Sequence, residues 1–161
     1  MRYTGKEAAE SENDEFASLR ESLQTVLKGL ELSLIELVIS RHRGSVQVKI
    51  VIYNGTAIGT NECSKAHRTI LPRLELFFGN QDIYLEVSSP GIDRLIKTAE
   101  EFTYYIGRGV RCYSTEISDW KAGILESIDE NGIIIKTKDG IENDIKFDVI
   151  AKAKLDPSQE V

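Results

Sequence analysis

The segment YLEVSSPGIDRLIK, residues 84–97, places a rigid polar turn directly after a strand-like pattern. Apolar and polar side chains alternate over its first five residues, as is typical of a half-buried strand. Ser89 precedes a proline and therefore favours extended backbone. Pro90-Gly91 suits the two central positions of a type II turn, where proline fixes φ and glycine accepts a positive φ. Because such a turn is stiffer than a Gly/Ser linker, we predict that it separates two small domains, with residues 92–97 as the hinge.

The residues before this turn predict an α+β domain over residues 16–91. Apolar side chains recur at helical spacing from Phe16 to Leu30, and Ser11 or Asn13 could cap this helix. Two segments rich in branched residues follow, joined by the short loop RHRG, and they predict a β-hairpin. The residues before Phe16 are polar and acidic, so residues 1–15 are predicted to form a flexible tail.

A second helix is predicted after the hairpin, and the strand of residues 84–88 follows it. Thr60 or Asn61 could cap this helix, and Glu62 would favour its positive end. Pro72 lacks a backbone N–H and clashes with the preceding turn, so we expect a break or a kink there. The element order is helix, strand, strand, helix, strand, which predicts two layers with the helices on one face of a small sheet.

Residues 98–161 predict a small closed or half-closed β-barrel. A short helical or turn segment, TAEEFTYYIGRG, comes first. Turn signals at residues 130–132 and 138–140 then separate runs of β-branched residues. Five short strands within about sixty residues are typical of a small barrel. The expected strands are residues 110–115, 121–129, 133–138, 141–147 and 149–155.

Charge is divided unevenly between the two predicted domains. The 161 residues carry a formal net charge of −6, which taken alone argues against a nucleic-acid-binding protein. Residues 16–97 hold 10 Lys and Arg against 8 Asp and Glu, whereas residues 98–161 hold 8 against 13. The first domain is therefore mildly basic and the second clearly acidic.

The sequence gives little support to catalysis, and we expect neither an enzyme nor a metal or cofactor site. Cys63 and His67 share a helical face, but the further ligands that a metal or nucleophile site needs are missing from the sequence. We interpret them as a packed cysteine beside a surface histidine. The sequence contains neither of the phosphate-binding glycine motifs G-x-x-x-x-G-K-[ST] and G-x-G-x-x-G. The two cysteines do not suggest a disulfide framework, and without a membrane-length apolar segment we expect a cytoplasmic monomer.

Basic side chains in the first domain form the most interesting candidate binding surface. Arg41 and Arg43 lie in the hairpin loop region, while Lys65 and Arg68 are three residues apart on the second helix. Cationic side chains of this kind could contact phosphates. Ordinary solubilising surface charge is the alternative, because Lys and Arg are common on every protein surface.

The chain resembles the bacterial ribosome maturation factor RimP family, most specifically in LEVSSPGIDR, residues 85–94. Cys63 near the start of the second helix and Gly123 within the strand KAGILESID are supporting matches, and the likeness covers residues 16–156. The family usually has proline where Leu95 stands here, so we expect a less stiff hinge. The resemblance implies a non-enzymatic assembly factor with a KH-like αββαβ domain and an SH3- or Sm-like barrel. Its implied partner is the immature small (30S) ribosomal subunit, through rRNA and a basic ribosomal protein near the decoding region.

The resemblance and the charge division together suggest a role for each domain. The basic domain would face rRNA through Arg41, Arg43, Lys65 and Arg68. The acidic barrel would hold the basic protein, since complementary charge speeds and orients encounter. Candidates for that contact are Glu116, Asp119, Asp129 and Glu130. The family motif and hinge comprise Ser88, Ser89, Pro90, Gly91, Asp93 and Arg94. Asp93 and Arg94 could form an ion pair, Asp93 could cap a turn, or both could contact a partner.

Two other functions remain open from the sequence. A free-standing KH-like RNA-binding protein fits the element order, but a KH module needs a G-x-x-G loop, and Gly55 and Gly59 are one residue too far apart. A small hydrolase or transferase would require an activated Cys63 or a carboxylate with a shifted pKa.

Overall fold

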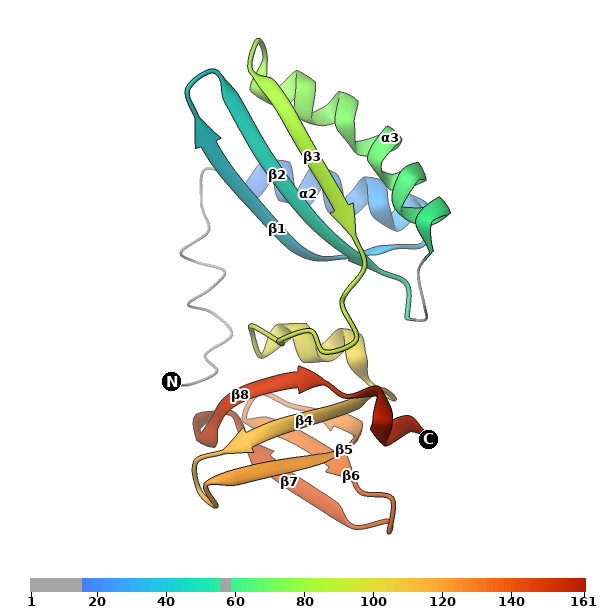
Figure 1. Cartoon of the computed structure of the whole chain (residues 1–161), viewed down its shortest axis with the longest axis vertical. Helices are drawn as coiled ribbons and strands as arrows, with labels where there is room; N and C mark the ends of the chain where they lie inside the picture. The colour runs from blue at the N-terminus through green and yellow to red at the C-terminus, as the bar shows by residue number, and fades with distance from the viewer. Residues whose placement is uncertain (1–15, 56–58) are drawn as a thin grey trace. The chain divides into compact units, whose positions relative to one another are not determined.

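The computed structural model describes residues 16–55 and 59–161, which form two compact units (Figure 1). Among these residues, the N-terminal unit extends to Pro90 and the C-terminal unit begins at Gly91. The predicted tail, residues 1–15, and the helix caps predicted within it at Ser11 or Asn13 lie outside the described residues.

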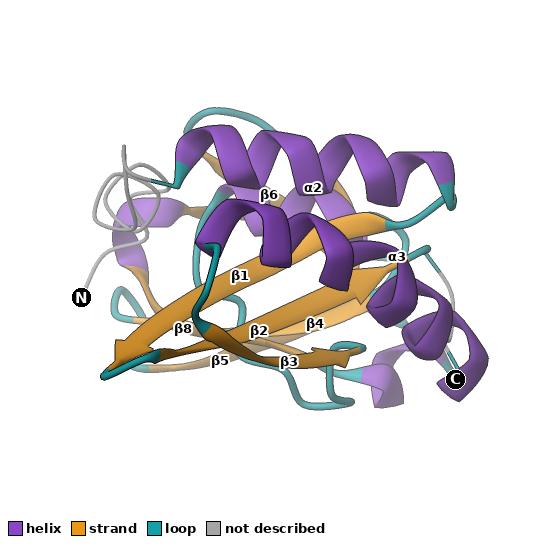
Figure 2. Ribbon diagram, turned by 90° about the horizontal axis from the view of Figure 1, so that it is seen from above, coloured by secondary structure: helices purple, strands orange, loops and turns teal. Residues whose placement is uncertain are grey.

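The N-terminal unit has the predicted element order: helix α2 (Ala17–Gly29), strands β1 (Ser33–His42) and β2 (Ser45–Tyr53), helix α3 (Thr60–Phe78) and strand β3 (Asp82–Ser88). Strand β2 is central, antiparallel to β1 and parallel to β3. Both helices cover one face of this sheet (Figures 1 and 2). Their apolar sides pack against the inward side chains of the strands in one hydrophobic core. The predicted α+β architecture is confirmed.

Helix α3 differs from the sequence predictions at Pro72 and at its N-cap. The sequence predicts a break or a kink at Pro72. The helix runs unbroken through Pro72, so the break is wrong. Pro72 is exposed, and water can therefore reach the carbonyl that loses its hydrogen bond, while buried residues on both sides of Pro72 hold the helix on the sheet. The N-cap is Gly59 rather than Thr60 or Asn61. Its N–H donates to Glu62 Oε2 at 3.0 Å.

The C-terminal unit is a five-stranded antiparallel sheet, preceded by a 3₁₀ helix, η1 (Glu100–Tyr105). Its strand order is β7-β6-β5-β4-β8, which is consistent with an SH3- or Sm-like domain and confirms the predicted run of short strands. Two further 3₁₀ segments, η2 (Phe147–Val149) and η3 (Pro157–Glu160), flank the last strand. The strands are β4 (Gly109–Ser114), β5 (Asp119–Ile128), β6 (Gly132–Lys136), β7 (Glu142–Lys146) and β8 (Ile150–Leu155).

The core of the C-terminal unit depends on close backbone approach at Gly123. A Cβ added at Gly123 would lie 2.5 Å from the carbonyl oxygen of Lys136 on β6, well inside van der Waals contact. Glycine therefore allows β5 to pass against β6 at this point. The inward side chains include Phe102, Tyr105 and Leu125, all fully buried.

The turn between the units differs from the predicted type II turn. The carbonyl of Gly91 accepts a hydrogen bond from the N–H of Arg94 at 3.1 Å, so the central residues of the turn are Ile92 and Asp93. Gly91 does not have a positive φ. The prediction of Pro90-Gly91 as the central pair is therefore wrong, because the turn closes two residues later.

Residues 92–97 are the predicted hinge, and their second half is hydrogen-bonded to strand β8 of the C-terminal unit. The N–H of Ile96 donates to the carbonyl of Ala153 at 2.9 Å, and Leu155 donates to the carbonyl of Arg94 at 3.0 Å. Leu95 thus forms an antiparallel bridge with Lys154 at the edge of β8.

Candidate interaction surfaces

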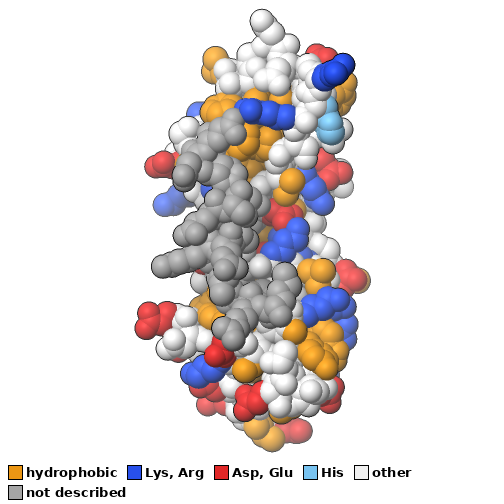
Figure 3. Space-filling model, turned by 90° about the vertical axis from the view of Figure 1, so that its left-hand side faces the viewer, with side chains coloured by type: hydrophobic (Ala, Val, Ile, Leu, Met, Phe, Trp, Pro, Cys, Tyr) orange, Lys and Arg blue, Asp and Glu red, His pale blue; other side chains and the backbone are white. Residues whose placement is uncertain are grey.

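Arg41, the first predicted RNA-facing residue, packs on an aromatic cluster. Its guanidinium carbon lies 5.0 Å from the centroid of the Phe16 ring and 5.9 Å from that of Phe78. Both distances suit a cation–π contact. Because Phe78 is the last residue of α3, this contact places Arg41 beside the C-terminal end of that helix. In Figure 3 a Lys or Arg side chain (blue) lies across hydrophobic surface (orange) of the N-terminal unit.

The four predicted RNA-facing residues do not form one cluster. Arg43 lies in the β1–β2 turn, close in sequence to Arg41. Lys65 and Arg68 are exposed on the first half of α3. Arg68 precedes Phe78 by ten residues, which at 1.5 Å per residue corresponds to about 15 Å along the helix. The cations therefore form two pairs on the N-terminal unit, separated by roughly that distance.

Arg68 borders a shallow groove of about 340 Å³ between α3 and β3, which is lined by Thr60, Cys63, Ser64, His67, Arg68 and Val87. Cys63 is partly buried and packs against the core. Burial and the nearby Glu62 raise the pKa of its thiol. His67 Nε2 lies 3.2 Å from the carbonyl oxygen of Leu85. His67 is thus half-buried and hydrogen-bonded rather than a surface residue, and a raised thiol pKa opposes an activated nucleophile.

The four predicted protein-facing carboxylates also divide into two pairs. Glu116 lies in the β4–β5 turn and Asp119 begins β5. Asp129 and Glu130 lie in the turn that follows the other end of β5. Since β5 has ten residues, the pairs are separated by at most about 30 Å along the strand. The two pairs therefore lie at opposite ends of β5.

Asp129 has a local structural role in its turn. Its Oδ1 accepts hydrogen bonds from the N–H groups of Asn131 at 2.7 Å and Gly132 at 2.9 Å. These bonds lower the pKa of the Asp129 carboxyl below its usual value. Asp119 likewise accepts from the N–H of Trp120 at 2.7 Å. All four carboxylates are exposed, and within the described residues neither Glu116 nor Glu130 makes a side-chain hydrogen bond to the backbone.

Arg94 of the family motif forms a buried ion pair within the C-terminal unit. Its Nε donates to Glu101 Oε2 at 2.7 Å and its Nη2 donates to Oε1 at 3.1 Å. Only 10% of the Arg94 side chain and 4% of the Glu101 side chain are exposed. Glu101 also accepts from the hydroxyl of Tyr105 at 2.9 Å and from the N–H of Lys97 at 3.2 Å. Burial, together with the charge of Glu101, raises the pKa of Tyr105.

The other motif residues form the connection between β3 and this ion pair. Ser88 ends β3, and Ser89 and Pro90 continue without helix or strand. Asp93 is an exposed central residue of the following turn. From the sequence, Asp93 is one possible partner for Arg94. The observed partner, Glu101, is seven residues further on, and its position depends on how η1 folds.

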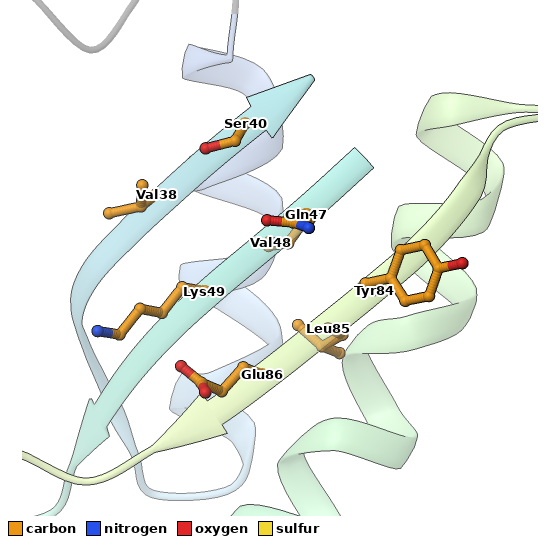
Figure 4. Close-up of a pocket in the computed structure, with 8 residues that line it drawn as sticks. All are labelled: Val38, Ser40, Gln47, Val48, Lys49, Tyr84, Leu85 and Glu86. Carbon is orange, nitrogen blue, oxygen red and sulfur yellow. The ribbon is translucent and has the colours of Figure 1, made fainter. Parts of the chain in front are cut away.

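The face of the N-terminal sheet opposite α2 and α3 is a surface that the sequence did not indicate. A shallow groove of about 430 Å³ crosses all three strands (Figure 4). Cross-strand pairing places Ser40, Gln47 and Tyr84 in one row and Val38, Lys49 and Glu86 in the next. Tyr84 is 61% exposed. Alternation in the strands identifies the outward residues, but it does not predict that both described helices of the N-terminal unit, α2 and α3, lie on the other face.

Within residues 16–55 and 59–161, no group of three His, Cys, Asp or Glu side chains is arranged to hold a metal ion. None of the helices in these ranges is both long and apolar enough to cross a membrane.

The fold defines a class of protein in which an αββαβ unit is followed by a small SH3- or Sm-like unit. A family model described as the RimP N-terminal domain matches residues 22–93. A protein of Borrelia turicatae and one of Borrelia hermsii, both called ribosome maturation factor RimP, are each 31% identical to the chain over 133 residues. Each match covers 83% of this chain and 90% of the relative. A Borrelia recurrentis protein of the same name is 29% identical over 145 residues, which are 90% of this chain and 96% of that relative. The chain belongs to the RimP family.

Proposed function

We propose that this protein binds the immature small ribosomal subunit and assists its assembly, contacting both rRNA and a basic ribosomal protein. The observation that carries the proposal is the identity to proteins called ribosome maturation factors over most of the chain. The two units would act as two binding modules, and neither requires a catalytic group for this function.

The N-terminal unit supplies cations for the RNA contact. Arg43, Lys65 and Arg68 are exposed, and Arg41 is anchored on two phenylalanine rings. Two pairs separated by about 15 Å suit two separate phosphate contacts rather than one, because phosphates along one RNA strand are distributed over such distances.

The C-terminal unit supplies carboxylates for the contact with a basic protein. Glu116 and Glu130 are exposed at opposite ends of β5, while Asp119 and Asp129 also hold local hydrogen bonds. Contacts at two ends of a strand would orient an elongated basic segment along the sheet, with a modest and salt-sensitive contribution to affinity.

Co-sedimentation of the full chain with purified ribosomal particles tests the proposal. We expect the protein to pellet with immature small subunits and not with large subunits. The variant R43Q/K65Q/R68Q should pellet several-fold less, since it removes three exposed cations. The control K136Q/K138Q/K146Q makes the same charge change on the C-terminal unit and should pellet like the unaltered protein. Equal recovery with large and small subunits would contradict the proposal.

A further inference from the structure

One face of the C-terminal sheet combines an exposed indole with three cations. Strands β8, β4 and β5 are neighbours in the sheet. Cross-strand pairing places Lys152, Tyr113 and Trp120 in one row, and Lys154 beside Arg111 in the next. The buried residues of β4 and β8 alternate with these positions, so the five side chains point away from the core. We call Arg111, Tyr113, Trp120, Lys152 and Lys154 the indole face.

Trp120 is held at the centre of the indole face. Its ring centroid lies 5.6 Å from that of Tyr113 in an edge-on contact. The guanidinium carbon of Arg111 lies 5.0 Å from the indole centroid, and Lys154 Nζ lies 5.7 Å from it. Trp120 nevertheless remains 37% exposed. A tryptophan that only filled the core would be covered, whereas this one presents aromatic surface beside positive charge.

The cations of the indole face have little neutralisation by carboxylates. Among the described residues, the ion pairs join Arg94 to Glu101, Arg108 to Glu160, Lys136 to Glu126 and Lys146 to Asp144. None involves Arg111, Lys152 or Lys154. Asp156 lies near Arg111. Although partial burial opposes it, the pKa of the Asp156 carboxyl is lowered by hydrogen bonds from Ser158 and Gln159 and by the charge of Arg111. The Asp156 carboxylate is therefore already engaged by its own turn. Asp119, next to Trp120 in sequence, is engaged with the backbone of Trp120.

We propose that the indole face binds single-stranded RNA, with the three cations contacting phosphates and Trp120 stacking on a base. Exposed aromatic rings and cations are the two components of sequence-tolerant single-strand binding, and stacking of one base contributes about 1–3 kcal/mol. An acidic peptide would match the charge but would leave the indole without a flat partner. This inference goes beyond the proposed function, which gives the C-terminal unit a protein contact and the N-terminal unit the RNA contact.

Trp120 is the only tryptophan of the chain, so its fluorescence reports directly on the indole face. We expect a 12-nucleotide oligouridine RNA to quench the fluorescence of the full-length protein as it binds. Three phosphate contacts predict a slope of about −2 for log affinity against log salt. The experiment contains no ribosome, so its failure would leave the proposed function untouched. RNA binding detected by anisotropy without any change in Trp120 fluorescence would overturn the inference, because the RNA would then bind elsewhere.

Two matched variants locate the contact, with binding measured by anisotropy of labelled RNA. We expect K152Q/K154Q to weaken binding about tenfold and to bring the salt slope to about −0.7, as two of the three phosphate contacts are lost. The control K136Q/K146Q changes the same charge on β6 and β7 and should bind like the unaltered protein. W120L should also weaken binding while keeping the salt slope. Equal losses in both lysine variants, or equal quenching of Trp120 by polyglutamate, would contradict a specific RNA site.

Discussion

Arg94 illustrates how a charged motif residue becomes part of a buried network. Its guanidinium and the Glu101 carboxylate form a two-bond pair that is almost inaccessible to water. Removing Arg94 would leave Glu101 buried without its counter-charge. We therefore expect R94A to lower the free energy of unfolding of the C-terminal unit by roughly 3–5 kcal/mol, measured by urea denaturation of the full chain.

The exposed pair Lys146–Asp144 is the matched control for this measurement. More than half of each side chain is exposed, so K146A should lower the free energy of unfolding by less than about 1 kcal/mol. The double variant R94M/E101L should recover part of the loss, although Tyr105 and Lys97 would still lack their acceptor. If R94A abolished subunit binding and left the unfolding free energy unchanged, a direct partner contact would replace the structural role.

Cys63 and Cys112 give a pH-dependent prediction at the same scale. Burial raises the pKa of both thiols, to about 12 for Cys112. A raised pKa means less thiolate at pH 7, so native Cys63 should react with a disulfide reagent more slowly than free cysteine. Its rate should increase as pH rises toward the raised pKa, and Cys112 should react only after unfolding. Absorbance of the released thiol measures both, and fast native labelling of Cys63 would support the nucleophile hypothesis.

At the scale of elements, the sequence predicted what depends on local pattern and missed what depends on long-range contact. Alternation, runs of branched residues and turn signals together identified the eight strands described in residues 16–55 and 59–161. The break predicted at Pro72 is absent because the packing of α3 outweighs a local propensity. Two features depend on how the strands are arranged in space. They are the separation of the four candidate carboxylates along β5 and the exposure of Tyr84 on the sheet face opposite α2 and α3. No spacing along the chain reports that.

Substitution by alanine should change stability differently at Gly123, in strand β5, and at Gly91, before the turn. At Gly123 a Cβ would meet the backbone of Lys136 at 2.5 Å, whereas at Gly91 the nearest atom is Asp93 Oδ1 at 3.7 Å. We expect G123A to lower the free energy of unfolding by roughly 1–3 kcal/mol through overpacking. G91A should leave it unchanged or slightly higher, since Gly91 does not use a positive φ. Thermal melts of both variants check this, and a large loss in G91A would contradict it.

Leu95 occupies the position where the family usually has proline. The two hydrogen bonds of its bridge to β8 use the N–H groups of Ile96 and Leu155, not that of Leu95. A proline at Leu95 would therefore keep both bonds and restrict the unfolded chain. We expect L95P to raise the free energy of unfolding by up to about 1 kcal/mol. I96P, which removes a donor from the same bridge, is the control and should be destabilised. A loss in L95P as large as that in I96P would contradict this account.

At the scale of the whole molecule, one acidic chain is proposed to bind both an anionic and a cationic partner. Its net charge of −6 repels RNA on average, so RNA binding must depend on local groups of cations within about a Debye length of the phosphates, near 10 Å at 0.1 M salt. The indole face meets this requirement because its three cations lie on adjacent strands. The exposed carboxylates Glu116 and Glu130 lie in turns beyond the ends of β5, so the C-terminal unit can present both signs of charge on different parts of its surface.

This arrangement predicts that the two activities of the C-terminal unit can be separated in the full chain. E116Q/E130Q should weaken binding to a purified basic protein of the small subunit several-fold at low salt and should leave oligouridine binding unchanged or slightly tighter. K152Q/K154Q should weaken oligouridine binding and should leave binding to the basic protein unchanged or slightly tighter. Both variants should reduce co-sedimentation with immature small subunits, and the reductions should shrink as salt rises because exposed charges are screened. Both variants could instead weaken the binding of RNA and of the basic protein equally. The surface charges of the C-terminal unit would then act only through their sum, and the proposal of separate contacts for RNA and protein on this unit would be wrong.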